Sequence, residues 1–428
     1  MGITALLARA VCVVACCLSL IQIALAQAPK TSSTAKDPIE AANLEFALSD
    51  SELNALQGQT FDVLLKNGKK ESGATLKGFL VGKQLKDRFR SIELTLADQK
   101  KSRKYPADQV FQLEREGKVA YLVAYLPTQK YHVLVDVTKR NEVIAKRLDD
   151  TGAEIWEEIS AEDQAKYVAE EKVFLDKVKT HFSALPLKLV ETQYFLFLSD
   201  MPPGQLNPYL QQLDKMNESL GQAFGYPPGH NIWRGKAVIV AFMAQSSFEE
   251  FEQQFMESAI DSQKAQGLCH PLNNGRVIVS AYRGTDANFF GSLLVHETAH
   301  GYVHRYKSSA EIPSWFHEGI ADWIAGQVVP ACKEVESTQR AAVQRLNETE
   351  RIGEDFFTAT NIDGWQYGVA SGMVQLLVQA NPSQFQLFFK GTKEGLSWDD
   401  SLMRAYGMTR ADLVSAYGRA IGVPHLQQ

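Results

Sequence analysis

Two histidines and a glutamate between Leu294 and His300 carry the strongest chemical signal in this sequence. The segment reads Leu-Val-His-Glu-Thr-Ala-His, so His296 and His300 are four positions apart with Glu297 between them. On a helix such positions share one face, and both imidazole rings can therefore bind one metal ion. Glu297 lies one residue round the helix, where its carboxylate can act on a water molecule without being a ligand. A third ligand is needed to complete the site.

A second helix is predicted downstream, with Pro313 and Ser314 at its start and Gly326 at its end. Glu318 on this helix follows His300 by 18 positions, which leaves room for one helix to end and the next to return beside it. Two imidazoles and one carboxylate, with one position left open for water, are a ligand set of catalytic zinc sites. Glu318 is therefore the predicted third ligand.

Asp322 lies one helical turn beyond Glu318 and on the same face, so it can accept the spare N–H of a ligand histidine and fix the orientation of its ring. Two other histidines compete as ligands. His304 shares the face of His300, but three ligands along one straight helix are too far apart to meet at one ion. His317 adjoins Glu318 and is expected to point to a different side of its helix. Both are predicted to be packing or rim residues.

This combination resembles the gluzincin metallopeptidases, the thermolysin-like group in which His-Glu-x-x-His is followed by Glu-x-x-x-Asp on the next helix. Glu318-Gly-Ile-Ala-Asp322 matches the second element, and the surrounding Trp-Phe-x-Glu-Gly-x-Ala is similar to the peptidase-MA-like branch of exported bacterial proteins. The resemblance covers residues 190 to 420. It implies one Zn²⁺ ion, a peptide or protein substrate, and Glu297 as the general base.

The resemblance implies two further features of the site. Tyr367 looks like the family's tyrosine that stabilises the oxyanion, although it could instead simply pack at the start of a helix. The strand Val277–Tyr282 is similar in position to the family's edge strand, along which an extended peptide pairs its backbone. Two alternative functions remain open: a noncatalytic envelope protein in which the metal helices form a scaffold, and a zinc hydrolase of a nonpeptide amide.

The elements that position these residues form an α+β catalytic domain, predicted to span residues 186–428. Short apolar runs at 194–198, 237–242 and 276–282 predict strands, and helical patterns separate them. Ser247 is the predicted N-cap of the helix after the second strand. The motif helix is therefore expected to rest on a mixed α/β layer.

A small β domain is predicted before it, at residues 51–137, because apolar and polar residues alternate there and Asn67-Gly68 is a strong hairpin signal. We expect a compact barrel that loosely resembles SH3-like modules. A helical linker is predicted at 138–185. Basic residues of the β domain could bind an anionic cell-envelope polymer, or be only a solvated face; they are Lys83, Lys86, Arg88, Arg90, Lys100, Lys101, Arg103 and Lys104.

The composition and the N-terminal segment indicate which partners and which compartment to expect for this chain. Its 428 residues are 45% hydrophobic and 22% charged, and the formal net charge of -6 argues against nucleic acid as the main partner. Residues 1–26 are typical of an export signal, with an uncleaved membrane anchor as the alternative. A flexible leader is predicted at 27–50. The protein is thus expected to be periplasmic or extracellular, with no stable membrane span after cleavage.

Five cysteines are present, and three of them lie in the predicted signal. Cys269 and Cys332 remain and flank the His-Glu segment. In an oxidising compartment they could form a disulfide that cross-links the two ends of the catalytic segment, or they could be two separate buried thiols. The sequence leaves both alternatives open.

Overall fold

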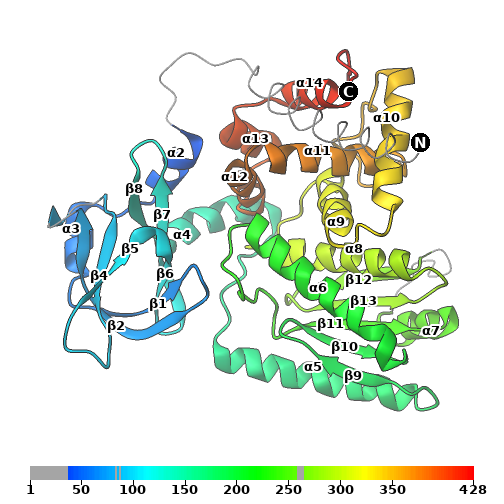
Figure 1. Cartoon of the computed structure of the whole chain (residues 1–428), viewed down its shortest axis with the longest axis horizontal. Coiled ribbons are helices and arrows are strands. Elements are labelled where there is room, and N and C mark those ends of the chain that lie inside the picture. Colours follow the sequence, from blue (N-terminus) through cyan, green and yellow to red (C-terminus); the bar gives the residue numbers. More distant parts are fainter. Residues whose placement is uncertain (1–36, 82–83, 86–87, 258–264) are drawn as a thin grey trace, which may run out of the picture.

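The computed structural model describes residues 37–81, 84–85, 88–257 and 265–428. The predicted export signal at 1–26 lies outside these residues. Two β-sheets, one in each half of the chain, are accompanied by helices in an α+β architecture, as predicted (Figure 1). Within the described residues, no helix combines the length and the apolar character that crossing a membrane requires.

The first sheet is antiparallel and has the strand order β5-β4-β2-β1-β6-β7-β8, with β3 paired to β2. A tight turn at Gly68, with φ of 82°, joins the first two strands, which confirms the hairpin predicted at Asn67-Gly68. The strands are β1 Thr60–Leu65, β2 Lys70–Val81, β3 Gln84–Leu85, β4 Ser91–Thr95, β5 Arg103–Pro106, β6 Val110–Arg115, β7 Lys118–Leu126 and β8 Tyr131–Asp136.

This sheet is not the closed barrel that the sequence predicted. In the described part of the chain, the strand pairing ends at β5 on one side and β8 on the other. Among the residues that the structure describes, only an isolated bridge, from Phe89 to His132, joins β8 to the segment before β4. The edge strand β5 has four residues, of which Tyr105 alone is buried, and a short charged edge of this kind resists further pairing.

Two helices precede the sheet, and the first of them lies in the stretch predicted as a flexible leader. α2 spans Pro38–Leu44, and the Asp37 side chain caps it by accepting from the backbone N–H groups of Ile39 and Glu40 at 2.9 and 3.1 Å. α3 spans Asp50–Ala55. Asp-Pro is a helix-start signal, so residues 38–44 are helical and the leader prediction is wrong there.

His132 on β8 makes the stability of the first sheet depend on pH. The side chain is 7% exposed, and burial lowers the pKa of its imidazole to about 4. Because the unfolded chain takes up this proton at about pH 6.5, stability is lost as the pH falls from 6.5 towards 4, by up to about 3 kcal/mol.

We expect His132→Leu to remove this part of the acid destabilisation, and urea unfolding of the two proteins at pH 7 and pH 5 measures it. Replacement of the exposed His425 is the control and should leave the pH dependence unchanged. Equal losses of unfolding free energy in wild type and His132→Leu would contradict the prediction.

The predicted linker consists of two helices. α4 spans Val137–Leu148, a short 3-10 turn follows at Asp149–Thr151, and α5 spans Ala161–His181. α4 begins directly at the end of β8, and the Asp136 carboxylate caps it by accepting from the backbone N–H of Lys139. The chain between the two helices pairs with the other half of the molecule through a bridge from Ile155 to Ser308.

The second sheet has the order β12-β13-β11-β10-β9. β10, β11 and β13 are parallel to one another, while β9 and β12 are antiparallel to their neighbours. The three predicted strands are therefore confirmed, but β13 is not at the edge: β12 is the outer strand of the described sheet. The strands are β9 Lys188–Glu191, β10 Phe195–Ser199, β11 Ala237–Phe242, β12 Gly267–Pro271 and β13 Val277–Tyr282.

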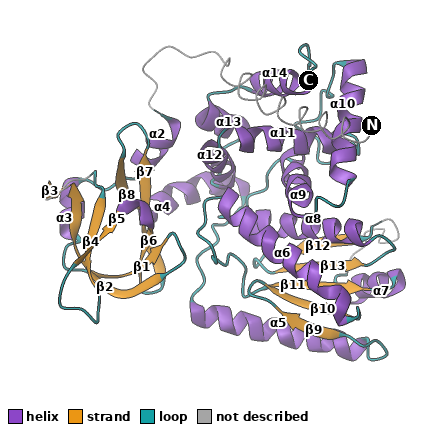
Figure 2. Ribbon diagram, in the orientation of Figure 1, coloured by secondary structure: helices purple, strands orange, loops and turns teal. Residues whose placement is uncertain are grey.

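Helices cover both faces of this sheet (Figure 2). These helices include α6 Pro203–Ala223, α7 Gln245–Phe255 and the motif helix α8 Ala287–Arg305. Alternate strand residues such as Leu196 and Val238 pack against α5 and α7, whereas Phe197 and Ile239 face the core beneath α6 and α8. Ser247 lies inside α7, whose N-cap is Ala244, so the predicted N-cap is wrong by one turn.

The C-terminal part is helical: α8 Ala287–Arg305, α9 Ser314–Val328, α10 Glu334–Thr349, α11 Gln366–Ala380, α12 Pro382–Lys393, α13 Trp398–Tyr406 and α14 Arg410–Ile421. α9 begins where the sequence predicted. It continues past Gly326, the predicted end, because Val328 is still buried in the core. The last helices contribute to the same core, as expected.

Candidate metal centre

The predicted site residues lie where α8, α9 and α11 pack together. The Asp286 side chain caps α8 by accepting from the backbone N–H groups of Asn288 and Phe289 at 2.7 and 3.0 Å. α9 packs against both α8 and α11. Gly319 allows the second contact, because a Cβ atom there would lie 2.7 Å from the carbonyl oxygen of Ala370. The Glu-Gly pair in the sequence thus positions a carboxylate and permits a close helix approach.

His296, His300 and Glu318 form one cluster. The Nε2 atoms of the two histidines are 3.1 Å apart, and they lie 3.4 and 3.5 Å from Oε2 of Glu318. These side chains are 18%, 12% and 18% exposed, so the cluster is accessible to a small ligand. The structure therefore brings together the three residues predicted as metal ligands. They are the one group of this kind among the described residues.

The spacing of these atoms fits a tetrahedral ion. With ligand bonds of about 2.0–2.1 Å, two atoms bound to one tetrahedral zinc ion are roughly 3.3 Å apart. The three measured separations, from 3.1 to 3.5 Å, bracket this value. Two imidazole nitrogens and a carboxylate oxygen are also the donor types that zinc prefers. The residues present therefore fit the metal that the sequence resemblance implies.

Asp322 lies where the sequence predicted it. Its Oδ1 is 2.8 Å from Nδ1 of His296. A proton on Nδ1 donates to this carboxylate and leaves the lone pair of Nε2 directed at the cluster. Burial lowers the pKa of the metal-free His296 ring, but Asp322 and Glu318 outweigh it and raise that pKa well above its usual range. A cation that binds there must displace this proton.

His317 orients the second histidine, a contact that the sequence analysis missed. Its Nε2 is 3.3 Å from Nδ1 of His300. Burial lowers the pKa of His317 to about 4 and also depresses that of His300, so both rings are neutral at pH 7. If Nδ1 of His300 donates to His317, the lone pair of Nε2 is free to bind a metal. In the sequence, the sign of this role was that His317 directly precedes Glu318, the predicted third ligand.

Replacing Asp322 with asparagine is expected to weaken zinc binding by about 10–100-fold, because the amide is a weaker acceptor for the His296 N–H. Competition with a chromophoric zinc chelator measures the affinity. Asp176→Asn, at an exposed position on α5, is the matched control and should bind zinc as the wild type does. Unchanged affinity in Asp322→Asn would show that the carboxylate does not orient the ligand.

Glu297 lies beside the cluster without belonging to it. Burial is the largest influence on its carboxyl group and, with the nearby Glu318, raises the pKa to about 7; His296 and His270 act in the opposite direction. Glu297 lies against β12, where a Cβ atom built on Gly267 would be 3.3 Å from its Cγ. A partly buried carboxylate beside three ligand atoms, and next to the edge strand, is positioned for proton transfer.

Tyr367 is in the first turn of α11 and lies near the same carboxylates. Burial, together with Glu318, Asp322 and Glu297, raises the pKa of its phenol to about 12, so it remains a hydrogen-bond donor at neutral pH. His304 lies away from the cluster, with its ring 5.5 Å from that of Trp156, as predicted for a packing residue.

The two cysteines do not form the disulfide that was one of the two alternatives. Cys269 and Cys332 are both free thiols. Cys269 packs against α8, where its Sγ lies 3.4 Å from a Cβ built on Gly301, and burial raises its pKa well above the usual value. The second alternative, two separate thiols, is the one observed.

Comparisons with known proteins add no relative. A scan against protein-family models finds no match, and a search of curated proteins finds no match either.

Proposed function

We propose that this protein is a zinc-dependent peptidase of the gluzincin type that hydrolyses peptide bonds with Glu297 as its general base. The observation that carries the proposal is the convergence of three ligand atoms within 3.5 Å of one another beside a carboxylate that binds nothing in that cluster. Peptide hydrolysis that requires zinc and stops in Glu297→Gln tests it.

His296, His300 and Glu318 would hold one zinc ion, which when bound supplies Lewis acidity to a water molecule and to the scissile carbonyl. Glu297 accepts the proton of the attacking water and passes it to the leaving amine. The pKa of about 7 for this carboxyl supports both transfers near neutral pH. Asp322 and His317 hold the two imidazoles in the orientation that leaves their Nε2 atoms free.

The edge strand β12 is the proposed place for the substrate backbone. β12 pairs with β13 on one side, and within the described residues its other side is free of strand pairing. It also packs against α8. An extended peptide that pairs with this edge would lie near Glu297, whose Cγ is 3.3 Å from a Cβ atom built on Gly267 of β12. This assigns to β12 the role that the sequence analysis gave to Val277–Tyr282.

Tyr367 is the proposed donor to the oxyanion. Because removal of one such donor costs about 10²-fold or more in kcat, Tyr367→Phe is expected to lower kcat by about 10²-fold with little change in zinc affinity. Peptide-hydrolysis kinetics measure this effect, and Tyr125→Phe, at an exposed position on β7, is the control. Wild-type turnover in Tyr367→Phe would reduce this residue to a packing role.

A scaffold function without catalysis is less well supported, because a structural metal site has no use for a carboxylate such as Glu297 beside its ligands. Export and an envelope-polymer partner remain proposals. Lys83 and Lys86 lie outside the described residues. The other basic residues of the first sheet that were singled out are exposed: Arg88, Arg90, Lys100, Lys101, Arg103 and Lys104.

A further inference from the structure

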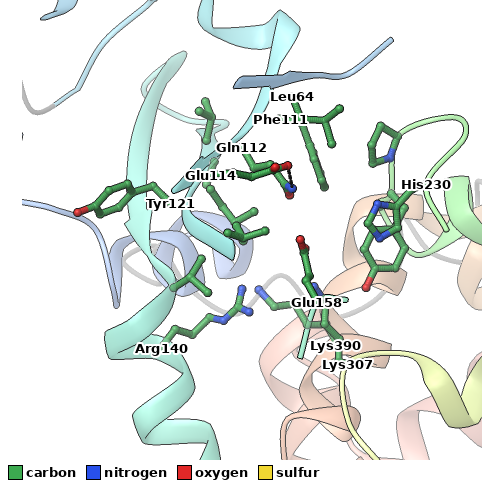
Figure 3. A pocket seen from close by; sticks show the side chains of 18 of the residues that line it. Leu64, Phe111, Gln112, Glu114, Tyr121, Arg140, Glu158, His230, Lys307 and Lys390 are labelled. Atoms are coloured by element: carbon green, nitrogen blue, oxygen red, sulfur yellow. Dashed lines mark hydrogen bonds between the residues drawn. The ribbon is translucent and has the colours of Figure 1, made fainter. Parts of the chain in front are cut away.

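A large cavity lies between the first sheet and the helical half of the molecule. Its volume is about 2160 Å³, and none of the proposed metal ligands lines it. β6 and β7 form one wall, where Gln112, Glu114 and Tyr121 are found, and His230 lies on the opposite side (Figure 3). Whatever binds here is therefore separate from the metal centre.

Three cationic side chains from different segments gather in this cavity, as Figure 3 shows. Arg140 comes from α4, Lys307 from the turn after α8, and Lys390 from α12. Lys307 has a left-handed backbone, with φ of 63°. Bringing like charges together is unfavourable unless an anion offsets them. Burial and the nearby Arg140 lower the pKa of Lys307 to about 7. For Lys390, Glu394 has the largest effect and raises the pKa, yet burial and Arg140 together still hold it below its usual value.

Arg140 is the most informative of the three. Its side chain is 8% exposed, yet within the described part of the chain its Nε and Nη1 atoms have no hydrogen-bond partner. The closest carboxylate oxygen, Oε1 of Glu394, is 3.8 Å from Nε, and the same oxygen is 3.9 Å from Nζ of Lys390. These distances are too long for hydrogen bonds. Burying a guanidinium with two unpaired N–H donors costs free energy, and a ligand that supplies acceptor atoms would offset this cost.

Three other charged groups around the cavity already have partners. Lys70 pairs with Glu114 at 2.6 Å, and Gln112 donates to the same carboxylate at 2.9 Å. Lys393 donates to the carbonyl oxygen of Ala310. Glu158 also reaches the cavity and interacts with Lys307 and Arg140, but its residue is exposed, so water weakens these interactions. The three cations therefore face two carboxylates, the buried Glu394 and the exposed Glu158.

We propose that Arg140, Lys307 and Lys390 bind a ligand that presents a phosphate group in this cavity. A carboxylate offers two oxygens in one plane, whereas a phosphate group offers three acceptor oxygens that point in different directions. The latter suits donors that approach from α4, α12 and the end of α8. A phosphate group also offsets the positive charge that remains after Glu394 and Glu158 are counted, and its own charge favours the protonated form of both lysines. The ligand would join the first sheet and its α4 helix to the helical half of the chain.

Calorimetric titration of the full chain with inorganic phosphate tests the proposal. Titrations with sodium acetate and with sodium chloride at the same ionic strength are the controls. Lys390→Gln and Lys307→Asn are expected to weaken phosphate binding by about tenfold or more, since each removes a charge-assisted hydrogen bond. Asparagine tolerates the left-handed backbone at position 307. Lys215→Gln, at an exposed helical position outside the cavity, should bind phosphate as the wild type does.

Glu318→Ala separates this site from the metal centre, because it should keep the wild-type phosphate affinity. Three results would overturn the proposal: no phosphate binding by the wild type beyond the effect of chloride, equal affinity in Lys390→Gln and Lys215→Gln, or acetate binding more tightly than phosphate. Circular dichroism of each variant shows that the chain is folded. A further variant, Arg140→Gln, should show the largest loss of affinity, since it removes two donors.

Discussion

Glu297→Gln is expected to lower kcat for peptide hydrolysis by about 10³-fold, within the range that general acid–base catalysis contributes. The amide keeps the shape of the side chain but cannot accept a proton. Zinc binding should be unchanged, because Glu297 is not part of the ligand cluster. Stability should not fall, since the pKa of about 7 shows that burial already disfavours the charged carboxylate.

The pH profile gives a second readout of the same substitution. The base form of Glu297 is lost as the pH falls through its pKa, which is about 7 in the metal-free chain. A bound cation favours the charged carboxylate and so lowers this pKa from the metal-free value of about 7. The acidic limb of the kcat/KM profile is therefore expected below pH 7. Glu348→Gln, at an exposed position on α10, is the matched control and should keep both rate and profile. A Glu297→Gln enzyme with wild-type turnover would rule out this general base.

Glu318→Ala is expected to weaken zinc binding by more than about 10³-fold, which exceeds the loss typical of an outer partner such as Asp322. Two imidazoles on one helix then remain, and their Nε2 atoms, 3.1 Å apart, lack the carboxylate that offsets the charge of the ion. Turnover should disappear together with the metal.

Equilibrium dialysis followed by metal analysis measures this loss, and Glu348→Ala serves as the control. Excess zinc should restore part of the occupancy but not the wild-type rate, because the geometry of the ligand set has changed. If Glu318→Ala retained one zinc per chain at wild-type affinity, the third ligand would have to be another residue.

The sequence predicted which residues form the metal-ligand cluster, but it did not predict all the contacts around that cluster. Local spacing determines which side chains share a helix face, so His296, His300, Glu318 and Asp322 meet as expected. The contact of His317 with His300 could not be predicted in the same way. It depends on the crossing angle between α8 and α9, which local spacing does not determine.

The errors in the predicted fold also arise where local sequence patterns do not determine the arrangement of the strands. Three strands were recognised from their apolar runs, but β12 was missed because Gly-Leu-Cys-His-Pro has no clear alternation, and the edge position was therefore given to β13. Closure of the first sheet into a barrel depends on how its end strands meet. That is a long-range property, and period-two alternation says nothing about it. The cavity around Arg140 lies between distant segments, so the sequence pattern gave no sign of it.

A peptide-library digestion tests the central claim most directly. The zinc-loaded chain and its Glu297→Gln variant are incubated with the same library, and new termini are identified by mass spectrometry. The account predicts that the wild type cleaves internal or terminal peptide bonds, that a chelator abolishes this cleavage, that added zinc restores it, and that the variant is inactive with zinc bound. Full zinc occupancy of the wild type with no cleavage of any peptide would contradict it.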